Sequence, residues 1–528
     1  METPDFILTI DLGTSGPKVS IFNEQLNLEC SEFHDVPLQL LGSEGVEQNP
    51  SDWIQAIEKC ISKLRNHRPE LFPLITAINV TSQWSGTVAL DRAGRPLGNA
   101  ISWMDSRGAP HAQKLMDGLI KVDGYEIFRL FRWIQITGGG PTKSGKDSIS
   151  HILYLKHERP EIYQQTDVFL EPKDFLNFFL SGRKCASHDS ITVHWLTDNR
   201  DIHRIRYSET LIKKSGIDRN KLPELIPTNS ILGKIRHELA REWGLSTEVS
   251  IIAGTPDLHS AAVGSGGVKD FTPHLYIGTS AWIVCHVPFK KTDLFHNMAS
   301  IPSGIPGRYM LVNEQQTAGA CLQYLKNQVF YPHDSIDGKN APSNIYHRMD
   351  ELAGGTPAGS EGLLFLPWLN GERSPMDQQH LRGGFINLSL KHEQKHLIRA
   401  VMEGVAFNLR WLMGYTEKFC GKPFEALHFI GGGAHSSVWS QILADALDRP
   451  IKKMKDPLTA NSKGAAALAL VALGKLKLED IEKHVQVDEV FTPSPKNRSI
   501  YDLGFKQFLS FYKSNQAFFK SMNQKEPL

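Results

Sequence analysis

Residues 7–23, ILTIDLGTSGPKVSIFN, combine residue types that suit phosphate and metal binding. Asp11 stands inside an apolar run, a Gly-Thr-Ser-Gly turn comes after it, and a second alternating run begins at Lys18. Backbone N–H groups at a glycine turn can surround an anion, and hydroxyls add donors. A carboxylate at a strand end can hold Mg²⁺ through water. The pattern leaves three interpretations open: an ordinary hairpin turn, a dinucleotide or P-loop cradle, and a different phosphate clamp.

The segment after the glycines separates these interpretations. In dinucleotide-binding and P-loop folds the glycine turn leads into a helix, whereas here it leads into KVSIF, a second predicted strand. HLYIGTSAWIVCHV at 274–287 repeats the order strand, Gly-Thr-Ser turn, strand. A third glycine run, LHFIGGGAHSSVWSQILADAL at 427–447, predicts a strand, a glycine turn and a helix, which suits an adenine or ribose against bare backbone. For one hairpin alone, Asp11 is more simply a turn cap; the three runs together favour nucleotide binding.

Two further segments match catalytic motifs in letters but not in context. GPTKSGKD at 140–147 nearly fits the P-loop pattern, but Asp147 takes the place of the Mg²⁺-binding hydroxyl and no apolar strand precedes the glycines. HEQKH at 392–396 fits the zinc pattern HExxH, yet it is a polar lead into a helix whose apolar face starts at Leu397. We expect neither a P-loop nor a zinc site there.

The surrounding elements predict an α/β protein. FILTIDLG, KVSIFN and LTAINVTSQ alternate as strands, and PSDWIQAIEKCISKLRNH places its apolar residues at helical spacing, with Ser51 as a plausible N-cap. The restart of the pattern after residue 267 indicates two halves of like construction with a cleft between them. LIRAVMEGVAFNLRWLMGYTEKF at 397–419 should pack the second half, and the aromatic face of KQFLSFYKSNQAFFKSMN predicts a C-terminal docking helix.

Composition excludes several classes of function. A chain of 528 residues should hold more than one core. With 58 Lys and Arg against 57 Asp and Glu, there is no overall field to attract nucleic acid or an anionic membrane. The N-terminus lacks the pattern of a signal peptide, and the longest apolar stretch, at 464–474, is too short to span a bilayer. Six cysteines without CxxC spacing suit reduced thiols. We expect a cytoplasmic protein that acts on a small molecule.

Several segments in order resemble the FGGY family of carbohydrate kinases, and the xylulokinase-like group in particular. The two hairpins and the GGGA run match the layout of the actin-like ATPase superfamily to which that family belongs. SQWSGTVALDRAGRPLGNAISWMDSR (82–107), IIAGTPDLHSAAVGSG (251–266) and LLFLPWLNGERSPMDQQHLRGGFINLS (363–389) are similar to family motifs. The resemblance runs from about residue 6 to residue 474. It implies two actin-like (ribonuclease H-like) domains with a cleft, an N-terminal domain over 1–266 and a C-terminal domain over 267–528.

The resemblance also implies an activity and its cofactors. The expected reaction is ATP-dependent phosphorylation of a small ketose or polyol, with D-xylulose or a similar pentulose as the default. Phosphoryl transfer depends on positioning and charge neutralisation. Asp257 is expected to accept the proton of the attacking hydroxyl, although a helix-capping role is the alternative, and Asp11 is expected to hold Mg²⁺. The residues expected to bind ATP are Gly13, Thr14, Ser15, Lys18, Gly278, Thr279, Gly319, Gln323, Gly432, Gly433, Ala434 and Ser437. For Gly319, tight helix packing is the alternative explanation.

The expected sugar site departs from the family pattern at two positions. Its residues are Asp257 together with Gln83, Trp84, Ser85, Trp103, Asp105 and Arg107. Trp103 is equally typical of a core residue, and Arg107 of a structural ion pair. Xylulokinases usually carry Met-His where this chain has Trp84-Ser85, and Asp-Asn where it has Asp257-Leu258, which opens the choice of ketose or polyol. A catalytically degenerate sugar- or nucleotide-binding regulatory protein is the second hypothesis. The oligomeric state, with a homodimer as one option, stays open.

Overall fold

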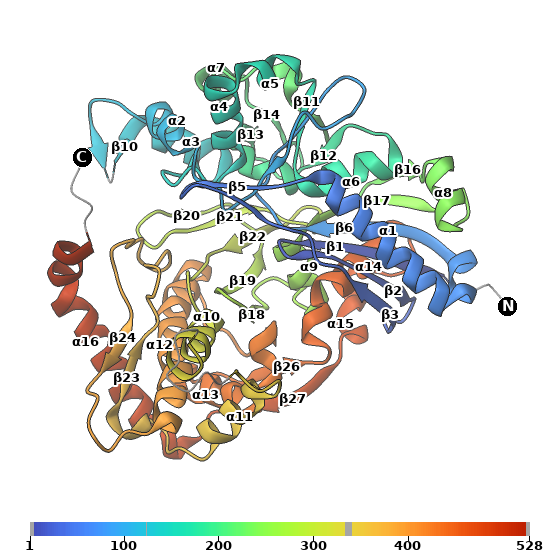
Figure 1. The fold of residues 1–528 in the computed structure, drawn as a ribbon. Coiled ribbons are helices and arrows are strands. Elements are labelled where there is room, and N and C mark those ends of the chain that lie inside the picture. The colour runs from blue at the N-terminus through green and yellow to red at the C-terminus, as the bar shows by residue number, and fades with distance from the viewer. Residues whose placement is uncertain (1–4, 123, 333–339, 524–528) are drawn as a thin grey trace.

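The computed structural model describes residues 5–122, 124–332 and 340–523. Its two largest sheets lie in different halves of the chain (Figure 1). The first has the strand order β16 (Ile231–Lys234), β17 (Ser250–Pro256), β6 (Ile75–Ser82), β1 (Phe6–Gly13), β2 (Gly16–Asn23) and β3 (Leu28–Phe33). The second has the order β20 (Thr292–Asp293), β21 (Met298–Pro302), β22 (Tyr309–Val312), β19 (Ala281–Val287), β18 (His274–Ile277), β25 (Leu427–Ile430), β26 (Ile451–Met454) and β27 (Val487–Phe491). A third core, between residues 89 and 222, gathers around Trp133, Ile149 and Phe169 beside the first sheet. The α/β prediction is therefore confirmed.

The two sheets share one pairing pattern. β1 (Phe6–Gly13) pairs antiparallel with β2 (Gly16–Asn23) and parallel with β6 (Ile75–Ser82), which in turn pairs parallel with β17 (Ser250–Pro256). β18 (His274–Ile277) pairs antiparallel with β19 (Ala281–Val287) and parallel with β25 (Leu427–Ile430), which pairs in parallel with β26 (Ile451–Met454). The repeat predicted from the two hairpins is thus a repeat of the strand pairing in the two sheets. The domain boundary at 266/267 itself remains a prediction.

The first hairpin is braced from behind by the chain that leaves β3 (Leu28–Phe33). Val36 N–H donates to Ser15 O at 2.9 Å, and His34 N–H donates to Pro17 O at 3.2 Å. Gly16 has φ +144°, and a Cβ there would lie 2.0 Å from His34 O, so only glycine fits. Beyond this brace, α1 (Pro50–His67) buries Trp53, Ile57, Cys60, Ile61 and Leu64.

One predicted helix boundary is wrong by two residues. The N-cap of α1 is Asn49, whose side chain accepts from Ser51 N–H, and not Ser51 itself. The physical reason is Pro50, which carries no N–H and has a φ suited to the first helical position, so the helix starts there. The sequence contained this signal, because an Asn-Pro pair directly precedes the apolar periodicity.

Both rejected motifs occupy ordinary structural positions. Asp147 is the N-cap of α4 (Ser148–Glu158), and its side chain accepts from Ser150 N–H, so the GPTKSGKD segment ends in a cap. Glu393 and His396 form a capping box at the start of α12 (Gln394–Cys420). Among residues 5–122, 124–332 and 340–523, no cluster of three or more metal-ligating side chains occurs and no helix is long and apolar enough to cross a membrane.

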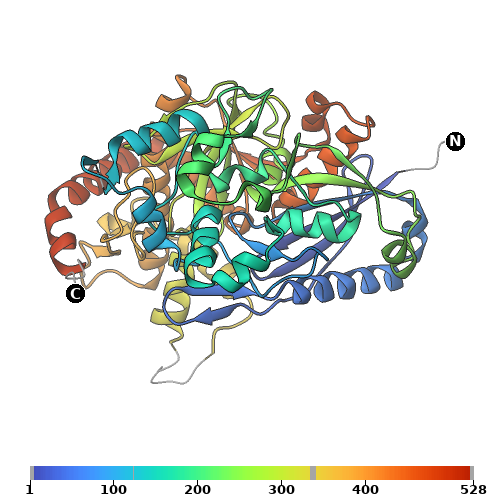
Figure 2. The same ribbon diagram turned by 90° about the horizontal axis from the view of Figure 1, so that it is seen from above.

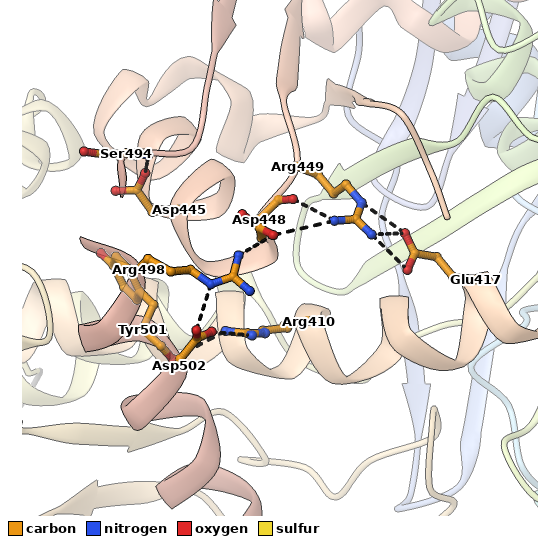
Figure 3. A network of polar contacts seen from close by, with 9 residues as sticks. All are labelled: Arg410, Glu417, Asp445, Asp448, Arg449, Ser494, Arg498, Tyr501 and Asp502. Atoms are coloured by element: carbon orange, nitrogen blue, oxygen red, sulfur yellow. Dashed lines mark hydrogen bonds and ion pairs between the residues drawn. The ribbon is translucent and has the colours of Figure 1, made fainter. Parts of the chain in front are cut away.

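The predicted C-terminal docking helix is confirmed. α16 (Arg498–Asn523) buries Tyr501, Phe508, Tyr512 and Phe519 and lies at the end of the molecule opposite α1 in both views (Figures 1 and 2). Arg498 bridges Asp448 and Asp502, and Asp502 also accepts from Arg410 of α12 at 2.6 Å (Figure 3). These ion pairs fix the helix against α12 and the end of α13 (Ser437–Leu447).

The two halves of the chain meet where the backbones of two helices, α9 and α14, approach each other closely. α9 (Asp257–Gly264) comes directly after β17, and α14 (Ala460–Ala472) lies beside β1 and β2 although it comes from the far end of the chain (Figure 1). A Cβ on Gly464 would lie 1.9 Å from Ser260 O, and a Cβ on Gly264 would lie 1.8 Å from Ala460 O. The helices therefore meet backbone to backbone, which only glycine allows.

Two buried histidines of the second sheet hold the segment that links the halves. His286 donates from Nδ1 to Gly267 O and His428 donates from Nδ1 to Ser265 O, each at 2.7 Å. His274 accepts from Trp282 Nε1–H at 3.0 Å. Burial lowers the pKa of His274 to about 3 and that of His286 to about 4. Both side chains are therefore neutral in the folded protein at pH 7.

The α9–α14 contact gives a paired prediction on stability. Gly464→Ala should lower the free energy of unfolding by about 3 kcal/mol, since backbone has to move to admit the methyl group. Gly414→Ala should raise it by about 0.5–1 kcal/mol, because Gly414 lies inside α12 with nothing within 4 Å of its Cβ direction. Urea unfolding midpoints measure both changes, and equal effects of the two substitutions would contradict the close contact.

The two buried histidines predict a contribution to stability that is lost in acid. Below about pH 6.5 the unfolded chain binds protons that neutral His274 and His286 do not bind in the fold. Their contribution to the free energy of unfolding should therefore fall as the pH drops from 6.5 toward 4, by about 1.4 kcal/mol per pH unit for each group, while buried carboxyls with a raised pKa, such as Asp257 and Glu372, contribute with the opposite sign. Urea unfolding at pH 7.5, 6.5 and 5.5 measures the slope. His286→Gln should remove the contribution of one histidine to the pH dependence of the free energy of unfolding. An unchanged pH dependence would refute the lowered pKa of His286.

Candidate functional site

Asp257 begins α9 at the point where β17 ends, half-buried and with its carboxylate little engaged. Its Oδ1 accepts from the N–H of the next residue, Leu258, at 2.7 Å, but the N-cap of α9 is Pro256, so Asp257 is the first helical residue and not the cap. Burial, the negative charge of Asp11 and, more weakly, that of Glu314 raise the pKa of Asp257 to about 7. A carboxyl group with such a pKa can exchange a proton near neutrality, which a general base requires.

Asp11 lies on β1 opposite Lys18 of β2 and is 8% exposed. Burial raises its pKa to about 6, while Lys18 and a hydrogen bond from Asn461 of α14 oppose the rise. Lys18 donates from Nζ to Leu458 O at 2.8 Å, so one hydrogen bond of its ammonium group goes to the C-terminal half of the chain. A buried carboxylate with this little compensation fits a Mg²⁺ ion that keeps its water ligands.

The two Gly-Thr-Ser turns differ in which of their hydroxyl side chains is exposed. Ser15 is exposed, but Thr14 Oγ1 donates to Gln83 Oε1 and accepts from Trp103 Nε1, both at 3.0 Å. Gly13 and Gly16 pair across this turn. Thr14 therefore joins the first hairpin to the expected sugar wall, a connection that its sequence position did not indicate.

The second turn is fixed by the loop before α10 (Gly319–Tyr324). Gly319 N–H donates to Gly278 O and Ala318 N–H to Thr279 O, both at 2.8 Å. A Cβ on Gly319 would lie 2.4 Å from Gly278 O, so the packing explanation for this glycine describes its contacts. Thr279 and Gln323 are exposed, with Gln323 one turn along α10.

The GGGA run presents bare backbone next to the second turn. Gly431 has φ +87°, and a Cβ on Gly433 would lie 2.8 Å from Ile277 Cβ, which brings the run against β18. Gly432 has nothing within 4 Å of its Cβ direction and is exposed, whereas Ala434 is buried. Ser437 is the exposed first residue of α13, whose cap is Ser436. An open glycine beside a helix start suits a flat ligand.

Two of the expected sugar residues, Trp84 and Ser85, are half-buried and bond different backbone carbonyl groups. Trp84 donates from Nε1 to Ser190 O at 2.8 Å, and its ring is 5.1 Å from that of His259 on α9. Ser85, with φ +68°, donates to Lys146 O at 3.2 Å. Gln83 is 5% exposed, and its amide group donates to Gln48 Oε1 and accepts from Thr14 Oγ1. Trp84 and Ser85 therefore have more freedom to meet a ligand than Gln83 has.

The W-x-D-x-R residues form a structural network in this state of the protein. Arg107 pairs with Asp105 at 2.7 Å and with Glu47 at 2.6 Å, and its guanidinium lies 4.6 Å from the centre of the Tyr154 ring. Asp105 also accepts from Val46 N–H at 2.8 Å. Trp103 is half-buried and points its indole N–H at Thr14. A substrate role for these three residues stays a prediction.

Sequence reasoning missed three charged residues near Asp257. Arg373 pairs with Glu314, and that carboxylate raises the pKa of Asp257. Burial and the positive charge of Arg373 lower the pKa of Lys146, which places Lys146 near the same pair. Glu314 and Arg373 come from the second half and Lys146 from the first. Their distance along the chain hid this grouping, although Arg373 belongs to the quoted GERSP segment.

Comparison with known proteins agrees with the geometry. Residues 6–264 match the N-terminal domain of the FGGY family of carbohydrate kinases, and residues 275–473 match its C-terminal domain. A xylulose kinase from Staphylococcus epidermidis is 28% identical over 97% of both chains. A gluconokinase from Bacillus subtilis is 25% identical over 89% of this chain and 88% of its own. The crystal structure of a xyloylose kinase from Brucella ovis superposes with a TM-score of 0.85 at 25% identity, covering 97% of this chain and 100% of that chain. The chain belongs to the FGGY family of carbohydrate kinases and is a xylulokinase-like sugar kinase.

Proposed function

We propose that the protein transfers the γ-phosphoryl group of Mg-ATP to a hydroxyl of a small ketose or polyol, with Asp257 as the general base. The observation that carries this proposal is the approach of two carboxylates from different elements, Asp257 and Asp11, whose mutual repulsion contributes to the raised pKa of Asp257. Asp257 would accept the hydroxyl proton as the oxygen attacks. The nucleotide phosphates would lie between the two turns.

The two carboxylates take different parts in this proposal. Bound Mg²⁺ would supply charge neutralisation of the phosphates, with Asp11 as its protein ligand through water. Exposed Ser15 and Thr279 face solvent at the two turns and would donate to phosphate oxygens. Gly432 and Ser437 would lie along the adenine and ribose, where bare backbone is open. Closure of the halves would exclude water and limit idle hydrolysis of ATP.

The acceptor is proposed as a ketose or polyol, with D-xylulose as the first compound to test. Support comes from xylulose kinases among the relatives, at 28% identity. Leu258 directly follows Asp257 and packs against the cluster of Ala262, Val284 and Met310. Trp84 contacts His259, which lies two residues after Asp257. Both departures from the xylulokinase pattern are therefore at or beside the start of α9. A site that hydrogen-bonds a hydroxyl discriminates strongly, and these apolar groups would not do so. A panel of ketopentoses, ketohexoses, heptuloses and polyols in a coupled ADP-release assay tests the proposal.

A regulatory protein that binds sugar or nucleotide without turnover is the second candidate. The replacement at Trp84-Ser85 is the observation in its favour. Retention of Asp11 and Asp257 in the positions described favours catalysis. The two candidates differ in one readout, since only the kinase releases ADP in proportion to a phosphorylated product.

Asp257→Asn should lower kcat by about 10³-fold, because removal of a general base typically costs 10²–10⁴-fold. Binding of a non-hydrolysable ATP analogue, measured by calorimetry, should change less than about threefold, since Asp257 is not proposed to contact the nucleotide. The measurement is ADP release with the best acceptor of the panel. Turnover within tenfold of the parent would contradict the role of Asp257.

Asp11→Asn should raise the Mg²⁺ concentration for half-maximal turnover by at least about tenfold, or abolish turnover. The neutral amide keeps the size of the side chain and its contact with Asn461 but loses the charge that holds the ion. A Mg²⁺ titration of ADP release measures this, and a Mg²⁺ titration of nucleotide-analogue binding gives a second readout. An unchanged Mg²⁺ dependence in both would refute the metal role.

A further inference from the structure

Glu372 is a fully buried carboxylate that accepts three hydrogen bonds from neutral donors. Its Oε1 accepts from Gln316 N–H at 2.8 Å and from Arg373 N–H at 2.9 Å, and its Oε2 accepts from Asn408 Nδ2 at 2.5 Å. Its exposed fraction is 0%. Burial raises its pKa to about 7, and the three donors oppose that rise. Donors on both oxygens favour the ionised form.

The loop that Glu372 holds is the one that fixes the second phosphate turn. Gln315 N–H donates to Ala281 O at 2.7 Å, and Ala281 N–H donates back to Gln315 O at 3.2 Å. Gln315 also donates from Nε2 to Asn408 O at 2.7 Å. Three residues further along, Ala318 and Gly319 donate their N–H groups to Thr279 O and Gly278 O. The turn is thus tied to the loop at both of its ends.

We propose that Glu372 and Asn408 act as positioning residues for the nucleotide phosphates. Through the loop at 315–319 the pair sets the place of Thr279 and Gly319 without touching the ligand. The inference rests on the proposed ATP site at the two turns. It also explains why a carboxylate is buried in the core of the second half: it organises backbone N–H groups of two loops, those of Gln316 and Arg373.

The donor pattern around the pair admits only one arrangement of charges. Asn408 Oδ1 accepts from Trp368 Nε1–H at 3.2 Å, so the Asn408 amide cannot turn round without placing NH₂ against that N–H. A Gln at 372 would put its own NH₂ against either Asn408 Nδ2 or the two backbone N–H groups. An Asp at 408 would face the Glu372 carboxylate. Each single substitution therefore places two hydrogen-bond donors, or two carboxylates, against each other in the buried core.

The double change should restore every hydrogen bond. In Glu372→Gln with Asn408→Asp, the amide oxygen at 372 accepts from the two backbone N–H groups and its NH₂ donates to the new carboxylate. The other oxygen at 408 still accepts from Trp368. The net charge of the protein is unchanged, and both side chains keep their sizes. The double variant is therefore the decisive test of a specific interaction.

The experiment measures the dissociation constant of a Mg²⁺-bound, non-hydrolysable ATP analogue by calorimetry. We expect Glu372→Gln and Asn408→Asp each to weaken binding by at least about tenfold, since an opposed buried donor or acceptor disturbs the loop. The double variant should return to within about threefold of the parent. In turnover assays KM for ATP should rise and recover in the same order, while KM for the acceptor changes less than about threefold.

Glu403→Gln serves as the matched control. Glu403 is also a buried carboxylate, on α12, but it bonds Ser360, Arg399 and Tyr501 instead of the loop at 315–319. It should lower the unfolding midpoint and leave nucleotide affinity unchanged. The inference is overturned if Glu403→Gln weakens binding as much as Glu372→Gln, if the single variants bind normally, or if the double variant recovers nothing. If the singles fail to fold, the double variant compared with the parent decides.

Failure of the proposed function would look different. A parent protein that does not bind the analogue would remove the nucleotide site itself, and binding that Thr279→Val leaves unchanged would place that site away from the second turn. Normal binding by the parent, loss with Thr279→Val and no effect at Glu372 would overturn only the positioning role.

Discussion

The backbone contact between α9 and α14 fixes the geometry on which the rest of the site depends. α9 begins with Asp257, and α14 carries Asn461, which bonds Asp11 of β1. Because Gly264 and Gly464 let these helices meet without side chains, elements from both ends of the chain converge on the two acids. A methyl group at either glycine would push the two helices apart, and these helices carry Asp257 and the Asn461 that bonds Asp11. The close packing of α9 and α14 therefore also constrains the place of the two proposed functional acids.

The same convergence creates the electrostatic character of the site. Burial and mutual repulsion raise the pKa of Asp257 to about 7, and burial raises that of Asp11 to about 6, which Lys18 offsets only in part. A cation at Asp11 would lower the cost of ionising both groups. In the proposed reaction, bound Mg²⁺ at Asp11 would therefore favour the ionised form of Asp257, the form that a general base requires.

The sequence predicted the parts of this arrangement that are local. A strand, a glycine turn and a second strand can be recognised within 17 residues, and its recurrence at 274–287 predicted the repeated topology. Long-range pairing was not predictable: Thr14 bonds Gln83 and Trp103, and Arg373 lies near Lys146 only because the halves fold together. The cap of α1 was missed although Asn49-Pro50 indicated it, since Ser51 was given more weight than the proline.

In the proposed function, selectivity for the acceptor and binding of the nucleotide would be set by different layers of the molecule. The proposed acceptor side includes two side chains that depart from the xylulokinase pattern: Trp84, which contacts His259, and Leu258, which packs against Ala262, Val284 and Met310. The proposed nucleotide side is mostly backbone, and Glu372 and Asn408 in the core would position it through the loop at 315–319. Side chains at a wall can be exchanged without moving the phosphates, because backbone hydrogen bonds from the loop at 315–319 hold the second turn. If the two sites lie as proposed, this separation would give a physical reason why one scaffold can phosphorylate different sugars, since the core would position the phosphates while a few residues around Asp257 would select the acceptor.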